Sequence, residues 1–445
     1  MRDITKISVM RKLYALILWA LLPLFAMGKG VLIQHVVIFD GKNPNTLTGN
    51  VWIEDHIIRK ISAEPIPVGE GVEVIDGRGK FLMPGMIDAH WHAYLAANTM
   101  VDLLTAHASY TQLRAGQEAG KTLLRGFTAI RDAGGPVFGL KRAIDEGTLP
   151  GPRIYPSGAI ITMTGGHGDF RMVYDIPEPF DCCGLTHTEK IGAAMVADGV
   201  DAVTVASRNN LRLGASQVKL MAGGGVSSLY DQLEDVQYFE DELHVAVMAA
   251  EDAGTYVMVH VYVPEAIRRA IKAGVKSIEH GQLIDEPTMK LIAEKGVWLS
   301  MQPFIGEGNN HYTTPDQQAK HEMVVRGTDN AYRLAKKYKV KLAWGTDLLF
   351  SPANAKNQNL NIEKMTRWFS NFEILKMITH DNAELLALSG RRNPYPGRLG
   401  VIEEGALADL IVVDGDPLDD IKVLTDPEKN LLLIMKDGKI YKNKL

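Results

Sequence analysis

The strongest constraint on the fold of this chain is a set of short apolar runs that each end in side chains able to bind a metal ion. These side chains are His90, His92, Lys219, His260, His280 and Asp347, and they occur in the runs PGMIDAHWH, QVKLMAGGG, YVMVHVY, SIEHG and AWGTD. Each run has the composition of a buried strand followed by a polar or glycine-rich loop. Because the carboxyl ends of the parallel strands in a barrel meet at one mouth, the pattern predicts a metal site there.

Strand-like and helix-like segments alternate through the middle of the chain, which predicts an α/β fold. Helical stretches such as DELHVAVMAAEDAG and VPEAIRRAIKAG end at glycine, as helices commonly do. We therefore predict a (β/α)8 TIM-like barrel over residues 85–392. Its strands are expected at 87–92, 127–131, 153–161, 217–222, 256–262, 277–280, 297–302 and 341–346.

The two ends of the chain differ from the middle in sequence pattern, because they contain short β-rich runs separated by turn signals. The first end contains VLIQHVVIFDG and NVWIEDHIIRKISA, and the last contains ADLIVVDGDP and NLLLIMKDGKIYKN. Half-sets of strands at opposite ends predict one small β-sandwich domain, assembled from residues 28–84 and 393–445.

Residues 1–27 resemble a secretory signal peptide. Arg11 and Lys12 precede an apolar run from Leu13 to Met27 that is short for a membrane span. We expect the mature protein to be exported, to a periplasm or beyond, without a stable membrane span. An uncleaved anchor is the alternative. The adjacent Cys182 and Cys183 are interpreted as two thiols, since a disulfide between neighbours is strained.

The overall charge excludes one class of partner. The 445 residues carry a formal net charge of -5, with 23% charged and 46% hydrophobic residues. No basic face is implied, so we expect no nucleic-acid partner.

Side-chain direction along the strands supports the metal site. His90 and His92 are two residues apart and share one face of a strand, while Trp91 points toward the helices. In YVMVHVY, alternation places His260 and Tyr262 on the inner face and the valines on the helix side. A lone histidine is usually structural, but strand-end histidines in consecutive units favour ligation of a divalent metal.

Lys219 lies in an apolar strand, and an inward ammonium beside metal ions would be strongly disfavoured. Burial favours the neutral amine, which can react with carbon dioxide to form an anionic carbamate that bridges two metals. A lysine that reaches solvent is the alternative. Asp347 can ligate one metal and carry a proton from a metal-bridging hydroxide to a leaving nitrogen.

With these residues, the chain resembles the amidohydrolase superfamily. Within that superfamily it is similar to the imidazolonepropionase-like group, which includes Xaa-Pro and Xaa-Arg dipeptidases and ochratoxin-hydrolysing amidases. The resemblance extends from about residue 30 to 445. It rests on PGMIDAHWH, GGHGD at 165–169, VKLMAGGGV, EHG, GTD and ADLIVVDGDPL.

The resemblance implies a binuclear centre of two divalent ions, with zinc as the expected metal. His90, His92 and Asp347 match the ligands of the first ion, and His260 and His280 match those of the second. Lys219 matches the carboxylated bridge. Manganese or cobalt could occupy the same donors.

Four further residues are candidates for contact with a substrate. His167 and Tyr230 are expected beside the reacting group, where the Tyr230 phenol could polarise a carbonyl. Tyr262 is a similar candidate, and Arg171 could pair with a substrate carboxylate. A loop-bracing histidine, packing tyrosines and an exposed loop arginine are the alternatives. Related sequences commonly have Asp-Pro where this chain has Asp231-Gln232. Because of this difference, the resemblance does not define the exact residues of the substrate pocket.

The predicted function is hydrolysis of an amide or peptide bond in a small substrate, a dipeptide or an N-acyl amino acid. A lactone, cyclic amide or phosphoester hydrolase with the same centre is the alternative. A non-catalytic binding or assembly module is a third hypothesis, which the presence of all six ligands disfavours. Homo-oligomers are common among relatives, so a homo-oligomer is possible here.

Overall fold

The computed structural model describes residues 30–175, 184–306, 312 and 314–445. The predicted signal peptide and the two cysteines, Cys182 and Cys183, lie outside these residues. Within the described part, no helix combines the length and the apolar character needed to cross a bilayer.

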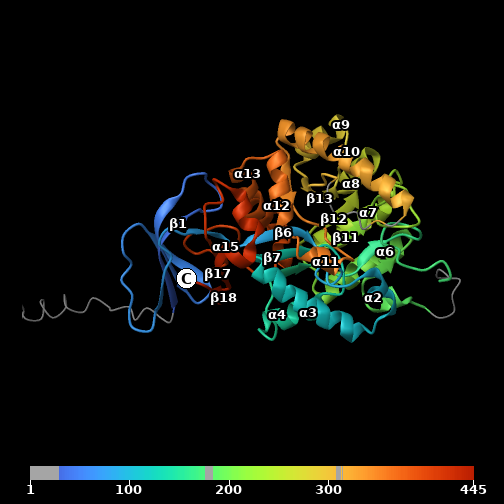
Figure 1. Ribbon diagram of the computed structural model, residues 1–445. Coiled ribbons are helices and arrows are strands. Elements are labelled where there is room, and N and C mark those ends of the chain that lie inside the picture. Colours follow the sequence, from blue (N-terminus) through green and yellow to red (C-terminus); the bar gives the residue numbers. More distant parts are fainter. Residues whose placement is uncertain (1–29, 176–183, 307–311, 313) are drawn as a thin grey trace, which may run out of the picture.

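One sheet contains strands from both ends of the chain, as the sequence predicts. Figure 1 shows the blue strand β1 beside the red strands β17 and β18 at the left of the molecule. The strand order is β18-β17-β16-β5-β1-β2-β3, and β4 also pairs with β1. The strands are β1 (Gly30–Ile38), β2 (Leu47–Glu54), β3 (Ile57–Ser62), β4 (Glu73–Asp76), β5 (Phe81–Pro84), β16 (Leu410–Val413), β17 (Leu431–Lys436) and β18 (Lys439–Asn443).

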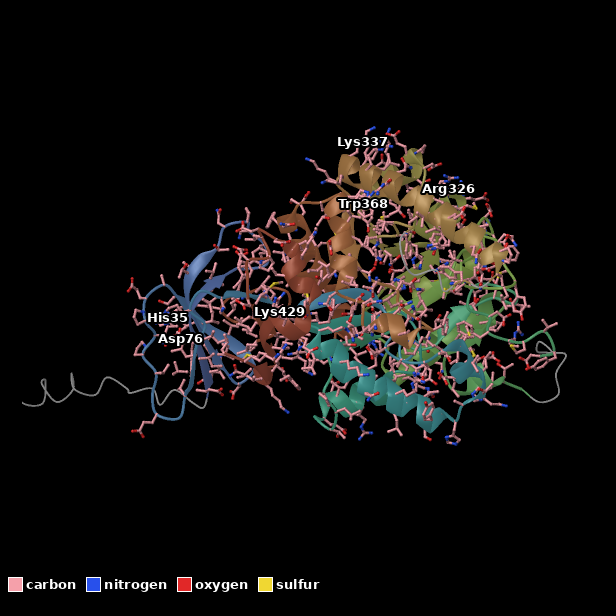
Figure 2. The ribbon with its side chains drawn as sticks, viewed as in Figure 1. His35, Asp76, Arg326, Lys337, Trp368 and Lys429 are labelled. Carbon is pink, nitrogen blue, oxygen red and sulfur yellow. The ribbon has the colours of Figure 1, made fainter. Side chains whose placement is uncertain are left out.

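The strands of this second domain form one connected hydrogen-bonded sheet. Strand β1 pairs with β2 on one side and with both β4 and β5 on the other. A register shift between Ile33 and Val36 bends β1, and His35 within it has a φ of 58°. The His35 ring pairs with Asp76 at 2.9 Å on the exposed surface of this sheet (Figure 2).

The middle of the chain forms two sheets of parallel strands. One has the order β6-β7-β8 and the other β10-β9-β11-β12-β13-β14-β15. The strands are β6 (Met86–Trp91), β7 (Phe127–Asp132), β8 (Arg153–Pro156), β9 (Ile160–Thr162), β10 (Ala194–Val196), β11 (Val218–Met221), β12 (Val257–Val261), β13 (Ser277–His280), β14 (Trp298–Met301) and β15 (Lys341–Trp344). Apart from β10, every strand overlaps a predicted one.

The strand predicted at 153–161 is wrong in one respect, because it is divided into β8 and β9. Gly158 between them has a φ of 79°, which is not a strand conformation. The Asn210 amide holds this bend by bonding to the nitrogen of Ala159 at 3.2 Å and to its oxygen at 2.8 Å. Strand β8 therefore pairs with β7, and β9 pairs with β10 and β11.

Strands β6 and β15 lie beside each other without a ladder of backbone hydrogen bonds among the described residues. The Asn382 amide lies between them instead. It donates to the carbonyl oxygens of Ile87 and Trp344 at 2.7 and 2.8 Å and accepts from the Trp344 nitrogen at 3.0 Å. This side chain satisfies backbone groups that a closed ladder would otherwise pair.

Helices surround the parallel strands (Figure 1). The predicted alternation in β12 is confirmed, because Val257, Val259 and Val261 pack in the core that α7 and α8 cover. Trp91 likewise packs toward α3. The helices are α2 (Met100–Thr105), α3 (Ala108–Leu124), α4 (Phe138–Asp145), α5 (His187–Lys190), α6 (Gly199–Leu213), α7 (Glu240–Ala253), α8 (Pro264–Ala273), α9 (Glu286–Lys295), α10 (Pro315–Tyr338), α11 (Pro352–Ala355), α12 (Leu360–Lys364), α13 (Asn371–Lys376), α14 (Asn382–Ala387) and α15 (Pro427–Asn430).

Candidate metal centre and substrate pocket

The six predicted ligands line one pocket of about 490 Å³ at the carboxyl ends of the parallel strands. His90 and His280 are at or near the last residues of β6 and β13, and Lys219 and His260 lie within β11 and β12. His92 and Asp347 follow β6 and β15. The strand ends therefore bring together residues that are up to 257 positions apart in the sequence.

His90 and His92 are each oriented by a hydrogen bond from Nδ1. In His90 this nitrogen donates to Glu279 Oε2 at 2.8 Å, and in His92 it donates to the Gly134 carbonyl oxygen at 3.0 Å. Burial, followed by the positive charge of Lys219, lowers the pKa of His90 to about 4. The neutral His90 ring therefore keeps a lone pair on Nε2, which faces the pocket.

His260 and His280 are fixed in the same manner, through different nitrogens. His260 donates from Nε2 to the Gly224 carbonyl oxygen at 3.1 Å, and His280 donates from Nδ1 to Gln302 Oε1 at 2.6 Å. Burial lowers the pKa of both rings, that of His280 to about 3. Their ring centroids are 4.4 Å apart, so two more imidazoles with a free lone pair lie side by side.

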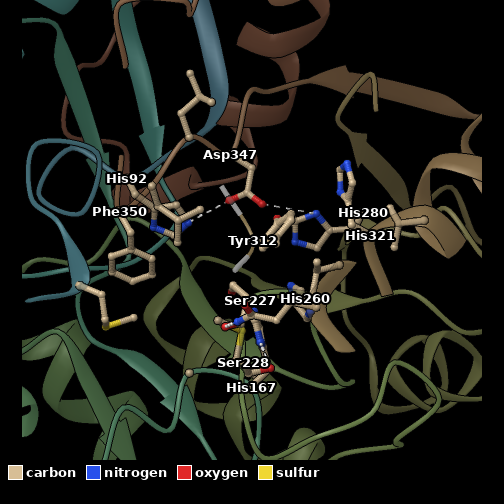
Figure 3. Close-up of a pocket in the computed structure, with 18 of the residues that line it drawn as sticks. His92, His167, Ser227, Ser228, His260, His280, Tyr312, His321, Asp347 and Phe350 are labelled. Carbon is tan, nitrogen blue, oxygen red and sulfur yellow. Dashed lines mark hydrogen bonds and ion pairs between the residues drawn. The ribbon is translucent and has the colours of Figure 1, made fainter. Parts of the chain in front are cut away.

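Asp347 reaches into the group of histidines from the loop after β15. Its Oδ1 is 3.4 Å from His90 Nε2 and 3.3 Å from His92 Nε2, and its Oδ2 is 4.0 Å from His280 Nδ1 (Figure 3). Burial alone would raise the pKa of Asp347, but the surrounding imidazoles outweigh it and hold that pKa below its usual value. Asp347 has a φ of 53°, and its nitrogen donates to the His90 carbonyl oxygen at 2.8 Å.

These atoms have the properties of metal ligands. One atom each of His90, His92 and Asp347 lies within 4.8 Å of the others. His90 Nε2 is buried and has no hydrogen-bond partner among the described residues. With the Nδ1 atoms already donating elsewhere, lone pairs and a carboxylate face one another, and this arrangement is unfavourable unless a cation lies between them. The donor set therefore fits a divalent metal ion.

Lys219 is buried to 1% exposure on β11 in the same pocket. No hydrogen bond or ion pair of its ammonium group occurs with any residue that the structure describes. Burial is the largest cause that lowers the pKa of Lys219, to about 8. The predicted solvent-reaching alternative is wrong for this residue, because the side chain is buried. The lowered pKa makes a larger fraction of the amine neutral near pH 7 than in an exposed lysine.

Two buried charged residues behind His90 were not recognised in the sequence. The Arg131 guanidinium donates to Glu279 at 2.6 Å and to the Ala89 carbonyl oxygen at 2.6 Å. Burial alone would raise the pKa of Glu279, but the Arg131 charge and the His90 hydrogen bond hold it well below its usual value. Glu279 is thus an ionised carboxylate that orients a ligand histidine. The available signal was a carboxylate inside the predicted strand SIEH.

Replacing Glu279 by glutamine is expected to weaken metal binding by about 10- to 100-fold, because His90 loses its anionic partner. The same change leaves Arg131 buried without its counter-charge, and should lower the free energy of unfolding by about 3–5 kcal/mol. Metal titration and denaturant unfolding measure the two effects. Glu294→Gln, at an exposed position on α9, is the matched control. Unchanged metal affinity in Glu279→Gln would contradict this orienting role.

Asp88 joins the loop that carries Asp347 to strand β6. Its carboxyl group accepts from the Thr346 hydroxyl at 2.6 Å, the Thr346 nitrogen at 3.1 Å and the Gln358 amide at 2.9 Å. Burial is the main cause that raises the pKa of Asp88 to about 6. These bonds fix the position of Asp347 relative to His90, which strand pairing alone would not do.

His167 lies beside the ligands, as predicted, and is held by residues that the sequence analysis did not single out. Its ring stacks on His260 with a centroid distance of 4.1 Å, and its Nδ1 is 2.9 Å from Ser228 Oγ (Figure 3). Ser228 in turn donates to Asp231. A Cβ at Gly225 would lie 2.1 Å from the His167 ring, so only glycine allows this approach. Asp231, which also accepts from the Gly225 nitrogen at 3.1 Å, thus serves to brace the loop.

Tyr230 and Arg171 are joined to each other rather than aimed at the ligands. The Tyr230 phenol donates to the Arg171 carbonyl oxygen at 2.8 Å, and the Tyr230 side chain is 42% exposed at the pocket. The Arg171 guanidinium donates to both oxygens of Asp169, at 2.8 and 2.6 Å. The Arg171 guanidinium is therefore already paired with a carboxylate of the protein itself.

Tyr262 follows β12 and lies over the histidines. It is buried, and its ring stacks on that of His280 with a centroid distance of 5.2 Å. Apolar side chains form much of the remaining pocket wall. They include Met100, Phe170, Val226, Phe304, Leu349 and Phe350. The pocket therefore combines a cluster of ligands with room for an apolar side chain.

Comparison with known sequences agrees with this geometry. The sequence profile described as Amidohydrolase family matches residues 81–441. Ochratoxinase from Aspergillus niger is 32% identical over 376 residues, which cover 81% of this chain and 75% of ochratoxinase.

Solved structures give the same result. A prolidase complexed with N-methylphosphonate-L-proline has a TM-score of 0.84 at 34% identity, over 93% of this chain and 99% of the prolidase. A Xaa-Pro dipeptidase with bound methionine has a TM-score of 0.79 at 30% identity, over 93% of this chain and all of the dipeptidase.

Proposed function

Because the chain belongs to the amidohydrolase family and so hydrolyses amide or peptide bonds, we propose that it is a binuclear metal enzyme acting on dipeptides or N-acyl amino acids. The observation that carries the proposal is the convergence of lone pairs from His90 and His92 on the Asp347 carboxylate. A closed (β/α)8 barrel is part of the proposal. It is supported by the order of the parallel strands and by the Asn382 bridge between β6 and β15.

Each ligand has a proposed place. His90, His92 and Asp347 would hold the first ion, and His260 and His280 the second. Lys219, as a carbamate, would contact both. Two bound divalent ions, with zinc expected, would supply an activated water and polarise the substrate carbonyl.

The protein's own groups then have separate tasks. Asp347 is ionised, so it can accept a proton and pass it to the leaving nitrogen. Burial lowers the pKa of His167, so its ring is neutral. Because its Nδ1 is bonded to Ser228, which itself donates to Asp231, the His167 Nε2 is left to accept a hydrogen bond from the substrate beside His260. Tyr230 and Tyr262 line the pocket and are further candidates for contact with the substrate. Apolar walls exclude water and strengthen these interactions.

The names of the relatives support an amide substrate with an amino acid as leaving group. The similar structures are a prolidase and a Xaa-Pro dipeptidase, and the similar sequence is an ochratoxinase. The pocket's mixture of apolar walls and polar groups suits such a substrate, since an acyl or aromatic part and a polar amino acid must both be held.

The test is release of free amino acids from a library of dipeptides and N-acyl amino acids. The protein would be reconstituted with zinc in bicarbonate, and chelation should abolish the activity until zinc is restored. We expect hydrolysis confined to a narrow class of leaving amino acid. If no member is cleaved by protein that holds two metals per subunit, the dipeptidase proposal is wrong, and lactones, cyclic amides and phosphoesters become the substrates to test.

A further inference from the structure

A lysine in the wall of the pocket has no role in the centre described above. Lys364 is the last residue of α12, which follows the loop carrying Asp347. Its ammonium group is partly buried and donates to Asn361 Oδ1 at 3.0 Å. Both side chains line the pocket that contains the six ligands. Lys364 therefore presents a cation to the same space as the reacting groups.

The charges around this pocket distinguish Lys364 from the other cationic side chains. The lysines and arginines among the described residues that line the pocket are Arg171, Lys219 and Lys364. Arg171 is paired with Asp169, and Lys219 lies within the metal centre. Lys364 makes no ion pair with a carboxylate in any of the described segments. Its positive charge is therefore available to a ligand.

Burial lowers the pKa of Lys364, since the ammonium has lost part of its hydration. A neutral amide oxygen, that of Asn361, compensates only partly for this loss. An anionic group entering the pocket would supply the missing counter-charge. The apolar part of the pocket wall, which includes Leu349 and Phe350, would strengthen the attraction by excluding water.

We propose that Lys364 binds the free carboxylate of the leaving amino acid. It thereby determines the preference for substrates whose leaving amino acid has a free carboxylate over the corresponding carboxamides. This inference rests on the proposed function. The contact with the substrate carboxylate was first predicted for Arg171, but the Arg171 guanidinium is already bonded to Asp169. Lys364 takes that place in the proposal. The leaving side is favoured because Lys364 and Asp347 belong to the same connection after β15, and Asp347 would deliver its proton to the leaving nitrogen.

The experiment compares each cleaved N-acyl amino acid with its carboxamide, which differs only in the charge of the leaving group. The wild-type enzyme should strongly prefer the acid. In Lys364→Met, the ratio of kcat/KM for acid and carboxamide should fall at least about tenfold, the usual scale for losing a hydrogen bond to a charged group. The change should appear mainly as a higher KM for the acid. Lys364→Arg should restore most of the preference, because it restores the positive charge.

Lys356→Met is the matched control, because Lys356 is exposed, lies just before α12 and does not line the pocket. Its acid-to-carboxamide ratio should equal that of the wild type. If wild-type enzyme cleaves the acid and Lys364→Met keeps the same ratio, the inference is overturned while the proposed function stands. An equal loss on both substrates also overturns it, since that result indicates a structural role. If the wild-type enzyme cleaves neither substrate class, the proposed function itself fails.

Discussion

Replacing Lys219 by methionine is expected to lower kcat/KM by roughly 10³-fold or more and to reduce the metal bound per subunit, the scale seen when a principal stabilising group is lost. The buried amine is proposed to attack carbon dioxide. A nitrogen–carbon bond forms, one carbonyl π pair moves to oxygen and one proton leaves the nitrogen for water. The lowered pKa of Lys219, about 8, makes this step accessible, because a larger fraction of the amine is neutral than for an exposed lysine. Methionine fills a similar volume but supplies no carbamate oxygen.

The Lys219 prediction can be separated from a failure to fold. Methionine replaces a buried amine that has no hydrogen-bond partner among the described residues, so the metal-free variant should be at least as stable as the metal-free wild type. Activity, metal content and a carbamate signal after growth with ¹³C-bicarbonate are the measurements. Lys276→Met, at an exposed position before β13, is the control. A Lys219→Met enzyme with two metals and normal activity would refute the carbamate bridge.

Changing Asp347 to asparagine is expected to lower kcat by roughly 10³-fold, with a smaller effect on KM. Asparagine has nearly the same shape and tolerates the positive φ of 53° at this position, so the loop should keep its conformation. It cannot accept a proton as a carboxylate does, and it is a weaker metal ligand. Steady-state kinetics over a range of zinc concentrations measures the effect.

A control variant and a measurement at excess zinc separate proton transfer by Asp347 from its role as a metal ligand. Asp252→Asn removes the same charge from an exposed position on α7 and should leave kcat unchanged. If excess zinc restores full metal content to Asp347→Asn but kcat stays low, the proton-transfer task is supported. A kcat within tenfold of the wild-type value under those conditions would remove Asp347 from proton transfer and leave it only as a ligand.

The inward direction of the candidate ligands could be predicted because strand geometry is local. Side chains alternate between two faces, so His260 and the flanking valines had to point in opposite directions. Parallel strands also align their carboxyl ends, and this places strand-end side chains together without further information. These two regularities were sufficient to place His90, Lys219 and His260 in one pocket.

Strand geometry could not predict the buried charged residues that orient the ligands, Glu279 and Arg131. Glu279 and His280 are consecutive and would face opposite sides of a regular strand, yet both reach the centre. His280 has a φ of 78°, and this local departure from strand geometry breaks the alternation. Arg131 meets Glu279 across 148 residues of sequence, and no local pattern encodes that pair.

The sequence by itself determined which side chains could ligate a metal and on which strands they lie, because composition and a two-residue period decide those properties. The tertiary structure alone decided which charges are neutralised. It paired Arg171 with Asp169 and Arg131 with Glu279, and left Lys364 without a carboxylate among the described residues. Ion pairing depends on distances between segments remote in the chain, and those distances exist only once the strands and loops have packed together.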